Sequence, residues 1–219
     1  MIGSLSTDII SQFQESFETN CLSLFGEAYT HINNTLNITV DWEEENISAN
    51  FFDYIDKSER AIGLNINISD EHRLYYQNIL SGQTTAKSAS RIDFRLTTNW
   101  TQAKRRCEFF IEAKNLIEND CIKKGRKTKL NAKKNHERYI NTGIDSFISN
   151  KYPRNGCLIG YILHGIPENI VSKINSILDS SNRNLENLKQ QSCQIENLTY
   201  FFISSHESQR KLKHYFIKF

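Results

Sequence analysis

Two short apolar stretches of the sequence carry charged side chains where β-strands rarely hold them. Asp93 lies within Arg91–Thr97, and Glu112 and Lys114 lie within Cys107–Lys114. Both stretches predict strands, and residues i and i+2 of a strand point to the same face. Glu112 and Lys114 therefore project together. If the two strands form a hairpin, Asp93 lies across from Glu112, and two carboxylates share a small area with one ammonium.

The residues alone leave two interpretations of this cluster open. One is a salt bridge in which Asp93 and Glu112 share Lys114, although sheet interiors are depleted in such residues and burying uncompensated charge is costly. The other is a Mg²⁺ site, because two carboxylates, waters and a substrate phosphate suit that ion. The metal would polarise the phosphoryl group, and Lys114 would position or deprotonate the attacking water or neutralise charge in the transition state.

The apolar pattern predicts the elements that position these strands. Apolar residues recur at three- and four-residue spacing across Ile9–Ile32, which predicts a first helix. Asp41, followed three residues later by Glu44, predicts the capped start of a second helix. Alternating apolar residues predict a strand over Ile62–Ile68, and we expect Asp70–Leu80 to form a short helix.

The second half of the chain alternates helices and strands. A helix is predicted from about residue 134 to residue 150, followed by Cys157–His164, an apolar strand of the kind that is buried on both faces. Pro167 begins another helix, and Leu198–Ser204 and Tyr215–Phe219 are predicted strands. This order predicts an α/β fold with a mixed central sheet flanked by helices and an extra N-terminal helix.

Charge is unevenly distributed, although 27 basic and 25 acidic side chains give a net charge of only +2. Residues 1–60 hold eleven carboxylates and two cations, whereas residues 104–138 hold twelve cations and five carboxylates. The basic stretch is either a solvated surface or a binding site for a phosphate backbone. Its candidate nucleic-acid-binding residues are Lys123, Lys124, Arg126, Lys127, Lys129, Lys133 and Lys134.

Composition excludes several classes of protein. The 219 residues are 38% hydrophobic and 24% charged, with nine Gly and two Pro, which excludes collagen-like and disordered chains. No stretch reaches the roughly 20 apolar residues that span a bilayer, and Met1–Ser4 does not resemble the start of a signal peptide. Five cysteines without Cys-x-x-Cys spacing predict reduced thiols in a cytoplasmic protein.

The charged residues and the element order together resemble the PD-(D/E)XK nuclease superfamily, which has the restriction-endonuclease-like fold. That family carries its Asp on the second core strand and Glu-x-Lys on the third. Here Asp93 and Glu112-Ala113-Lys114 match these positions. The similarity extends over residues 41–219, so we expect a nuclease-like domain there, preceded by an amphipathic helix and connector over residues 1–40.

Two further positions can be compared with the family pattern. Ile92 replaces the proline of the family's name, a departure that leaves the acidic ligand in place. Many members also carry an acidic residue on the preceding helix, for which Glu44 is the best match and Glu45 the substitute.

The resemblance implies Mg²⁺-dependent hydrolysis of DNA phosphodiester bonds, with Mn²⁺ as a substitute metal. It implies a catalytic set of Asp93, Glu112, Lys114 and Glu44. The implied metal ligands are Asp93, Glu112 and the backbone carbonyl of Ala113. The expected substrate is double-stranded DNA, and the expected role is defence against foreign DNA, alone or as the nuclease subunit of a larger complex.

Other functions remain compatible with the sequence. The chain could be a catalytically inactive nuclease-like scaffold, against which the intact Asp/Glu/Lys set argues, or a nucleic-acid-binding subunit that does not cleave. The acidic N-terminal helix could bind a protein partner, form a homodimer or pack on its own sheet. No membrane association is expected.

Overall fold

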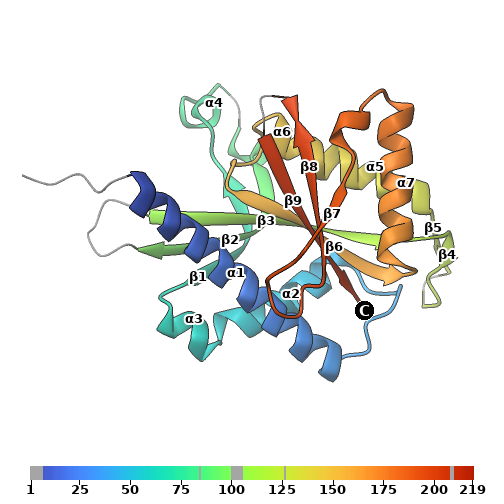
Figure 1. The fold of residues 1–219 in the computed structure, drawn as a ribbon, viewed down its shortest axis with the longest axis horizontal. Coiled ribbons are helices and arrows are strands. Elements are labelled where there is room, and N and C mark those ends of the chain that lie inside the picture. The colour runs from blue at the N-terminus through green and yellow to red at the C-terminus, as the bar shows by residue number, and fades with distance from the viewer. Residues whose placement is uncertain (1–6, 84, 100–105, 126, 208–209) are drawn as a thin grey trace, which may run out of the picture.

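The computed structural model describes residues 7–83, 85–99, 106–125, 127–207 and 210–219, which form a central sheet with helices on both faces (Figure 1). Within these ranges, seven strands follow one another across the sheet in the order β1-β2-β3-β6-β9-β8-β7. Their bounds in this order are Asn67–Leu74, Ser90–Asn99, Arg106–Ile117, Gly156–His164, Arg210–Lys218, Tyr200–His206 and Lys189–Gln191. Two further strands, β4 (Cys121–Ile122) and β5 (Lys129–Leu130), form a separate antiparallel pair.

The main sheet is mixed, as the sequence predicts. Strands β1, β2 and β3 are antiparallel neighbours, whereas β3 pairs in parallel with β6 and β6 pairs in parallel with β9. Strand β8 is antiparallel to both β9 and β7. Parallel pairing of β3 with β6 requires a crossover between them, and the crossover contains the helical segment that begins with α5.

Helices cover the two faces of the sheet. The first group is α1 (Thr7–Thr35), α2 (Glu44–Asp56) and α3 (Glu59–Gly63). The second group is α5 (Ala132–Arg138), a π-helix (Tyr139–Ile144), α6 (Asp145–Ile148) and α7 (Pro167–Ser180). Short helical turns occur at α4 (Gln77–Leu80), Ala86–Ser88 and Asn184–Glu186.

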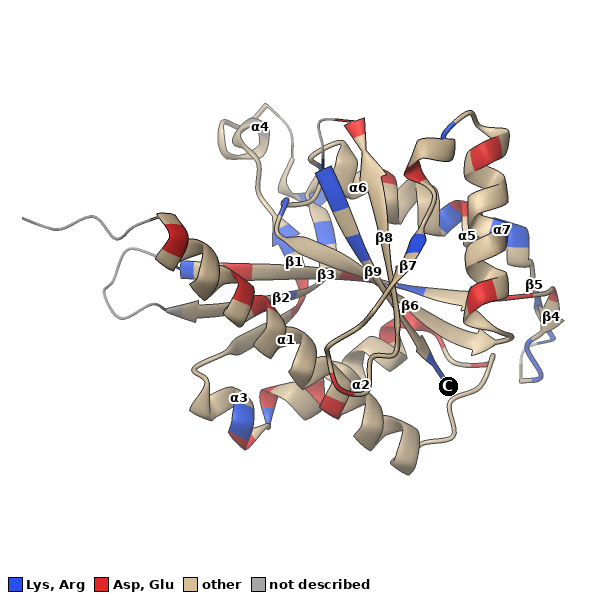
Figure 2. Cartoon of the chain, viewed as in Figure 1, with Lys and Arg blue, Asp and Glu red and all other residues tan. Residues whose placement is uncertain are grey.

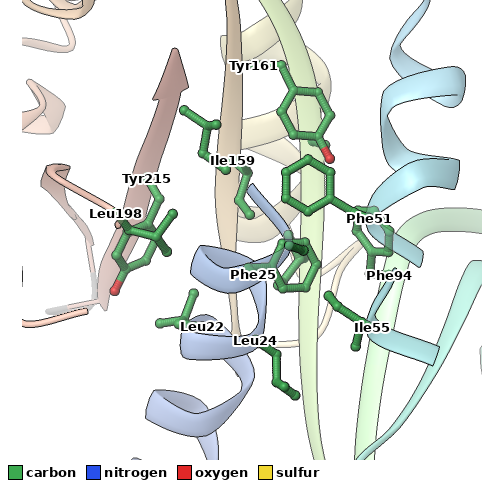
Figure 3. Packing of buried hydrophobic residues seen from close by; sticks show 14 of the residues in the cluster. Leu22, Leu24, Phe25, Phe51, Ile55, Phe94, Ile159, Tyr161, Leu198 and Tyr215 are labelled. Atoms are coloured by element: carbon green, nitrogen blue, oxygen red, sulfur yellow. The ribbon is translucent and has the colours of Figure 1, made fainter. Parts of the chain in front are cut away.

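Each helical group has its own hydrophobic core. Alternate residues of β6 separate cleanly, since Ile159 and Tyr161 pack with α1 and α2, whereas Leu158 and Ile162 pack with α5–α7. Figure 3 shows the first core, where Phe25 of α1 stacks on Phe51 of α2 at a centroid distance of 5.4 Å.

The apolar stripe of α1 is part of this core. Cys21, Leu24, Phe25 and Ala28 have no exposed surface. The N-terminal helix therefore packs on its own sheet, and its apolar face is not free for a partner. Ile9, near the start of the helix, is 47% exposed and lies outside the core.

Three sequence predictions in the first half are wrong. Helix α2 begins at Glu44, and Glu43 rather than Asp41 occupies the capping position, without a side-chain cap. Ile62 belongs to α3, and β1 covers Asn67–Leu74, so Asp70–Leu74 of the segment expected to be helical is a strand and only its end, Gln77–Leu80, is a helix. The apolar alternation over residues 62–68 does not form a strand, because α3 continues to Gly63 and Asn65 adopts a positive φ of 53°. The strand therefore begins only at Asn67.

Most other predicted elements are confirmed. The β2–β3 hairpin, the buried strand β6, the helix that begins at Pro167 and the two terminal strands are all present. Residues 100–105 of the expected hairpin loop lie outside the described residues. The five cysteines are free. Among the described helices, none is long and apolar enough to cross a membrane.

Candidate active site

The strands that carry the charged residues separate at Asp93. The ladder between β2 and β3 stops at the pair Phe94↔Ile111, while β2 continues beside β1 as far as Ser90. Phe94 packs in the α1–α2 core, but Ile92, two residues away, packs in the α5–α7 core. Because residues two apart share a face in a regular strand, the strand is irregular at Asp93, where it leaves β3.

Two carboxylates replace the lost strand partner along this edge of β3. The Ala113 N–H donates to Asp93 Oδ2 at 2.6 Å, and the Asn115 N–H donates to Glu44 Oε2 at 2.8 Å. Residues two apart direct their N–H groups to the same edge of a strand. Buried backbone donors need acceptors, so the edge exposed by the departure of β2 fixes the positions of both carboxylates.

Lys114 joins the carboxylates into one group. Its Nζ donates to Glu112 Oε1 at 2.5 Å, to the Ala113 carbonyl at 2.8 Å and to Glu44 Oε1 at 3.4 Å. Glu44, Glu112 and Lys114 are 7%, 5% and 4% exposed. We call Glu44, Asp93, Glu112 and Lys114 the charged cluster. The structure brings together all four residues predicted as catalytic.

Burial makes the charged cluster electrostatically unusual. Desolvation raises the pKa of Asp93 to about 6, and desolvation together with the Asp93 charge raises the pKa of Glu112 to about 7. Desolvation acts to lower the pKa of Lys114, but the charges of Glu112, Glu44 and Asp93 outweigh it, and the pKa of Lys114 is raised. The site thus disfavours ionised carboxylates and holds a protonated lysine, so an additional cation would stabilise the carboxylates.

Two buried oxygen atoms without hydrogen-bond partners in the described part of the chain belong to the charged cluster and to the residue after Lys114. Glu112 Oε2 and Asn115 Oδ1 are buried and have no hydrogen-bond partner among the described residues. Desolvation raises the pKa of Tyr152, which follows α6, and the charges of Glu112 and Asp93 and a side-chain interaction with Glu112 raise it further. A buried oxygen without a close donor is costly, and Glu112 Oε2 is therefore a suitable ligand atom.

The donor set can be compared with what a metal requires. Among the described residues, no group of three or more His, Cys, Asp or Glu side chains is arranged to hold a metal ion. Magnesium, however, is commonly bound by one or two carboxylates together with waters and substrate oxygens. Asp93, Glu112 and the Ala113 carbonyl fit this pattern, provided that Lys114 gives up its bond to the carbonyl.

The basic stretch contains a short β-hairpin beside the charged cluster. Strands β4 and β5 pair, and we call residues 121–130 the basic hairpin. The hairpin is tied to the segment before α2, because the Gly125 N–H donates to Asp41 and Lys123 Nζ lies 2.9 Å from Glu43 Oε1. Glu43 directly precedes Glu44, so the basic hairpin borders the charged cluster. In Figure 2 the described part of the segment between β4 and β5 carries blue, the colour of its lysines.

The seven candidate phosphate-binding residues are not equivalent. Lys123 is only 6% exposed and is ion-paired with Glu43, so it is not available to bind a phosphate backbone. Lys129 pairs with Asp120 at 3.2 Å and Lys133 with Glu137 at 3.8 Å, but both lysine side chains remain more than 70% exposed. Exposed positions are also held by Lys124, Lys127 and Lys134. Arg126 lies outside the described residues.

Sequence reasoning missed one charged residue of the site. Arg138, the last residue of α5, donates to Glu44 Oε1 at 2.8 Å while its side chain is 47% exposed. Its position 94 residues from Glu44 gives no local signal.

Comparisons with known proteins leave the family open. No family model, no curated protein and no solved structure matches this chain.

Proposed function

We propose that the chain is a metal-dependent nuclease that hydrolyses DNA phosphodiester bonds, with a fold of the restriction-endonuclease-like type. The observation that supports this most strongly is the charged cluster. Asp93 and Glu112 come from two strands that separate where the carboxylates lie, and Lys114 contacts Glu112 directly. Element order adds support, since a helix precedes three antiparallel strands and β6 then pairs in parallel with β3.

Each residue has a role in this proposal that follows from its contacts. Asp93, Glu112 and the Ala113 carbonyl would hold Mg²⁺, or Mn²⁺ in its place, and the bound ion would supply Lewis-acid stabilisation of phosphoryl charge. Lys114, protonated in the buried cluster, donates hydrogen bonds and neutralises charge beside the reacting phosphate. Glu44 holds Lys114 and the Asn115 N–H in place, and is a positioning residue.

The basic hairpin supports nucleic acid as the substrate. The hairpin that carries its exposed lysines is tied to the segment that leads into Glu44, so a phosphate backbone bound there would continue toward the charged cluster. Such contacts position a backbone without reading sequence. We infer duplex DNA as the substrate and defence against foreign DNA as the role from the family resemblance alone.

A second function is favoured by one observation. Lys114 bonds both to Glu112 and to the Ala113 carbonyl, so the cluster is partly compensated without any metal. This arrangement would suit a catalytically inactive nuclease-like scaffold or a nucleic-acid-binding subunit of a larger complex.

Cleavage assays separate the two functions. The purified chain is incubated with supercoiled plasmid and with linear duplex, in Mg²⁺ or Mn²⁺ and in EDTA, beside Asp93→Asn and Glu112→Gln. We expect cutting by the wild type alone, stopped by EDTA, because losing one ligand removes several kcal/mol of transition-state stabilisation. DNA binding without cutting would favour the inactive subunit, and equal cutting by Asp93→Asn would overturn the metal assignment.

A further inference from the structure

Arg138 lies at the boundary between the charged cluster and solvent. One of its N–H groups donates to Glu44 Oε1 at 2.8 Å, and the side chain is 47% exposed. Lys114, the other cation bound to the same oxygen, has a side chain that is only 5% exposed. A ligand approaching the charged cluster from solvent therefore meets the guanidinium before it meets the ammonium.

Most of the hydrogen-bonding capacity of Arg138 is unused. A guanidinium has five N–H donors in a fixed planar fork, and among the described residues Glu44 is the only side chain that accepts from it. The Glu44 carboxylate is fully engaged, because it also accepts from Lys114 and from the Asn115 N–H. Glu44 therefore fixes one edge of the guanidinium and leaves the other edge available.

The backbone at this point holds Arg138 in position. The next residue, Tyr139, is fully buried, and its hydroxyl bonds to His214 Nδ1 at 2.8 Å. A helical residue that directly precedes an anchored residue cannot rotate freely, so the outward direction of Arg138 is set by the core. Lys134, four residues earlier on α5, is exposed and shares this side of the helix.

We propose that Arg138 is a phosphate-binding residue of the candidate active site, whose free guanidinium edge binds the DNA phosphate that enters the charged cluster. The inference rests on the proposed nuclease function and adds a substrate-contacting residue to it. Arginine suits this role because its planar fork matches two phosphate oxygens at once. In the bound state Glu44 keeps the fork oriented, and the phosphate replaces solvent on the open edge.

The test compares four variants in DNA binding without hydrolysis. Anisotropy of a fluorescent duplex is measured in EDTA over a range of salt concentrations. For Arg138→Gln we expect about ten-fold weaker binding at low salt and a salt slope reduced by about 0.9, the loss of one phosphate contact. Arg138→Lys should keep the slope but bind more weakly, because it retains the charge and loses the fork. Glu44→Gln should keep the slope.

Arg60→Gln is the matched control. Arg60 of α3 is 46% exposed and, within the part of the chain that the structure describes, forms an ion pair with Glu27. Helices α3 and α5 lie well apart in Figure 1, so removing the Arg60 charge should not alter the slope. In cleavage assays with Mg²⁺, Arg138→Gln should raise KM while its thermal stability stays close to that of Arg60→Gln.

The outcomes separate this inference from the proposed function. Wild type that cuts DNA, with the same slope and KM in Arg138→Gln as in Arg60→Gln, overturns the role of Arg138 alone. Equal loss of affinity in Arg138→Gln and Glu44→Gln also overturns it, because Arg138 would then act only by supporting Glu44. Wild type that neither binds nor cuts DNA overturns the nuclease proposal together with the inference.

Discussion

The Ala113 N–H donates to Asp93 Oδ2 at 2.6 Å, at the level where the β2–β3 ladder has already ended. A side chain thus occupies the place of a strand carbonyl. This contact lowers the cost of burying the Asp93 carboxylate, but desolvation outweighs it and the pKa remains raised to about 6. The carboxylate is therefore held in a fixed position in an environment that disfavours its charge.

Asp93→Asn should stabilise the metal-free protein at high pH. A carboxyl whose pKa is raised by folding contributes stability at low pH that is lost as pH rises through the folded pKa. The pKa of Asp93 is raised from 3.8 to about 6, which corresponds to about 3 kcal/mol. Asn keeps an oxygen for the Ala113 N–H and has no charge to bury. In EDTA at pH 8 we expect the variant to exceed wild type by up to this amount.

Urea unfolding at pH 8 and near pH 4 measures this effect. Near pH 4 the Asp93 carboxyl is protonated in the folded protein, so the advantage of Asp93→Asn should largely vanish. A difference in unfolding free energy that is the same at both pH values would contradict the raised pKa of Asp93.

Lys114→Met should destabilise the metal-free protein and increase its response to metal. Removing the ammonium leaves Glu112 and Glu44 buried without their shared donor, and breaking a buried pair from one side costs about 3–5 kcal/mol. Added Mn²⁺ should then raise the melting temperature of Lys114→Met more than that of wild type, because the ion no longer competes with Lys114 for the Ala113 carbonyl. Cleavage should fall sharply.

Lys213→Met provides the control for lost lysine charge. Lys213 pairs with Glu18, and its side chain is 40% exposed, so its removal should cost less than about 1 kcal/mol. If Lys114→Met stays folded but shows no Mn²⁺ response at all, Lys114 is itself required for the ion to bind and the competition described above is wrong.

The sequence was sufficient for the part of the site that is local. Asp93, Glu112 and Lys114 could be predicted because a period-two pattern fixes which strand residues share a face, and the hairpin is a short-range pairing. Glu44 was assigned only through the family resemblance. Its bond to the Asn115 N–H joins residues 71 positions apart, and no periodicity encodes such a contact.

The errors also have local causes. Ile62, Ile66 and Ile68 alternate, but Ile62 lies in α3 and is 70% exposed, because the strand begins only after Asn65, whose φ is positive. Lys123 is a different case, because nothing in a run of basic residues shows that one of them is buried against Glu43. Runs of like charge report average exposure and do not identify individual buried members.

A series of hydrogen bonds between buried polar side chains, which we call the histidine network, is expected to stabilise the fold. Glu186 Oε2 lies 2.7 Å from His206 Nδ1, His206 Nε2 lies 2.7 Å from Ser204 Oγ, and Ser204 Oγ lies 2.8 Å from His214 Nε2. The Tyr139 hydroxyl is the last member of the histidine network and bonds to His214 Nδ1. An ionised Glu186 requires His206 Nδ1 to donate, so Ser204 donates to His206 and accepts from His214, and every member is satisfied with both imidazoles neutral.

Ser204→Ala should lower the unfolding free energy by about 1–3 kcal/mol for each imidazole nitrogen that loses its partner. The exposed neighbour Ser205→Ala should change it by no more than about 0.5 kcal/mol. Urea unfolding at pH 7.5 measures both variants. Equal stability of Ser204→Ala and wild type would mean that the hydrogen bonds of the histidine network do not form as described.

The histidine network also predicts that the stability of the protein falls in acid. Burial lowers the pKa of His206, and burial followed by the His206 charge lowers the pKa of His214 to about 3. A folded pKa below the unfolded value of about 6.5 means that the unfolded state binds more protons under acidic conditions. Stability should fall as pH drops below about 6.5, and His214→Gln should show a smaller fall than wild type between pH 6.5 and pH 4.

Neutralising the exposed lysines of the basic hairpin should weaken DNA binding without loss of stability. The variant replaces Lys124, Lys127 and Lys129 with Ala and leaves Lys123 intact, because Lys123 is buried against Glu43. Each lost phosphate contact should reduce the slope of log K against log salt by about 0.9, so full engagement of all three would flatten it by about 2.7. Binding is measured by anisotropy at several salt concentrations in EDTA.

Lys123→Ala is the contrasting variant: it should lower the melting temperature, since the ion pair between the buried Lys123 and Glu43 is lost, and leave the salt slope unchanged. An unchanged slope in the triple variant, with wild type binding DNA, would show that the basic hairpin is a solvated surface and that the DNA lies on another face.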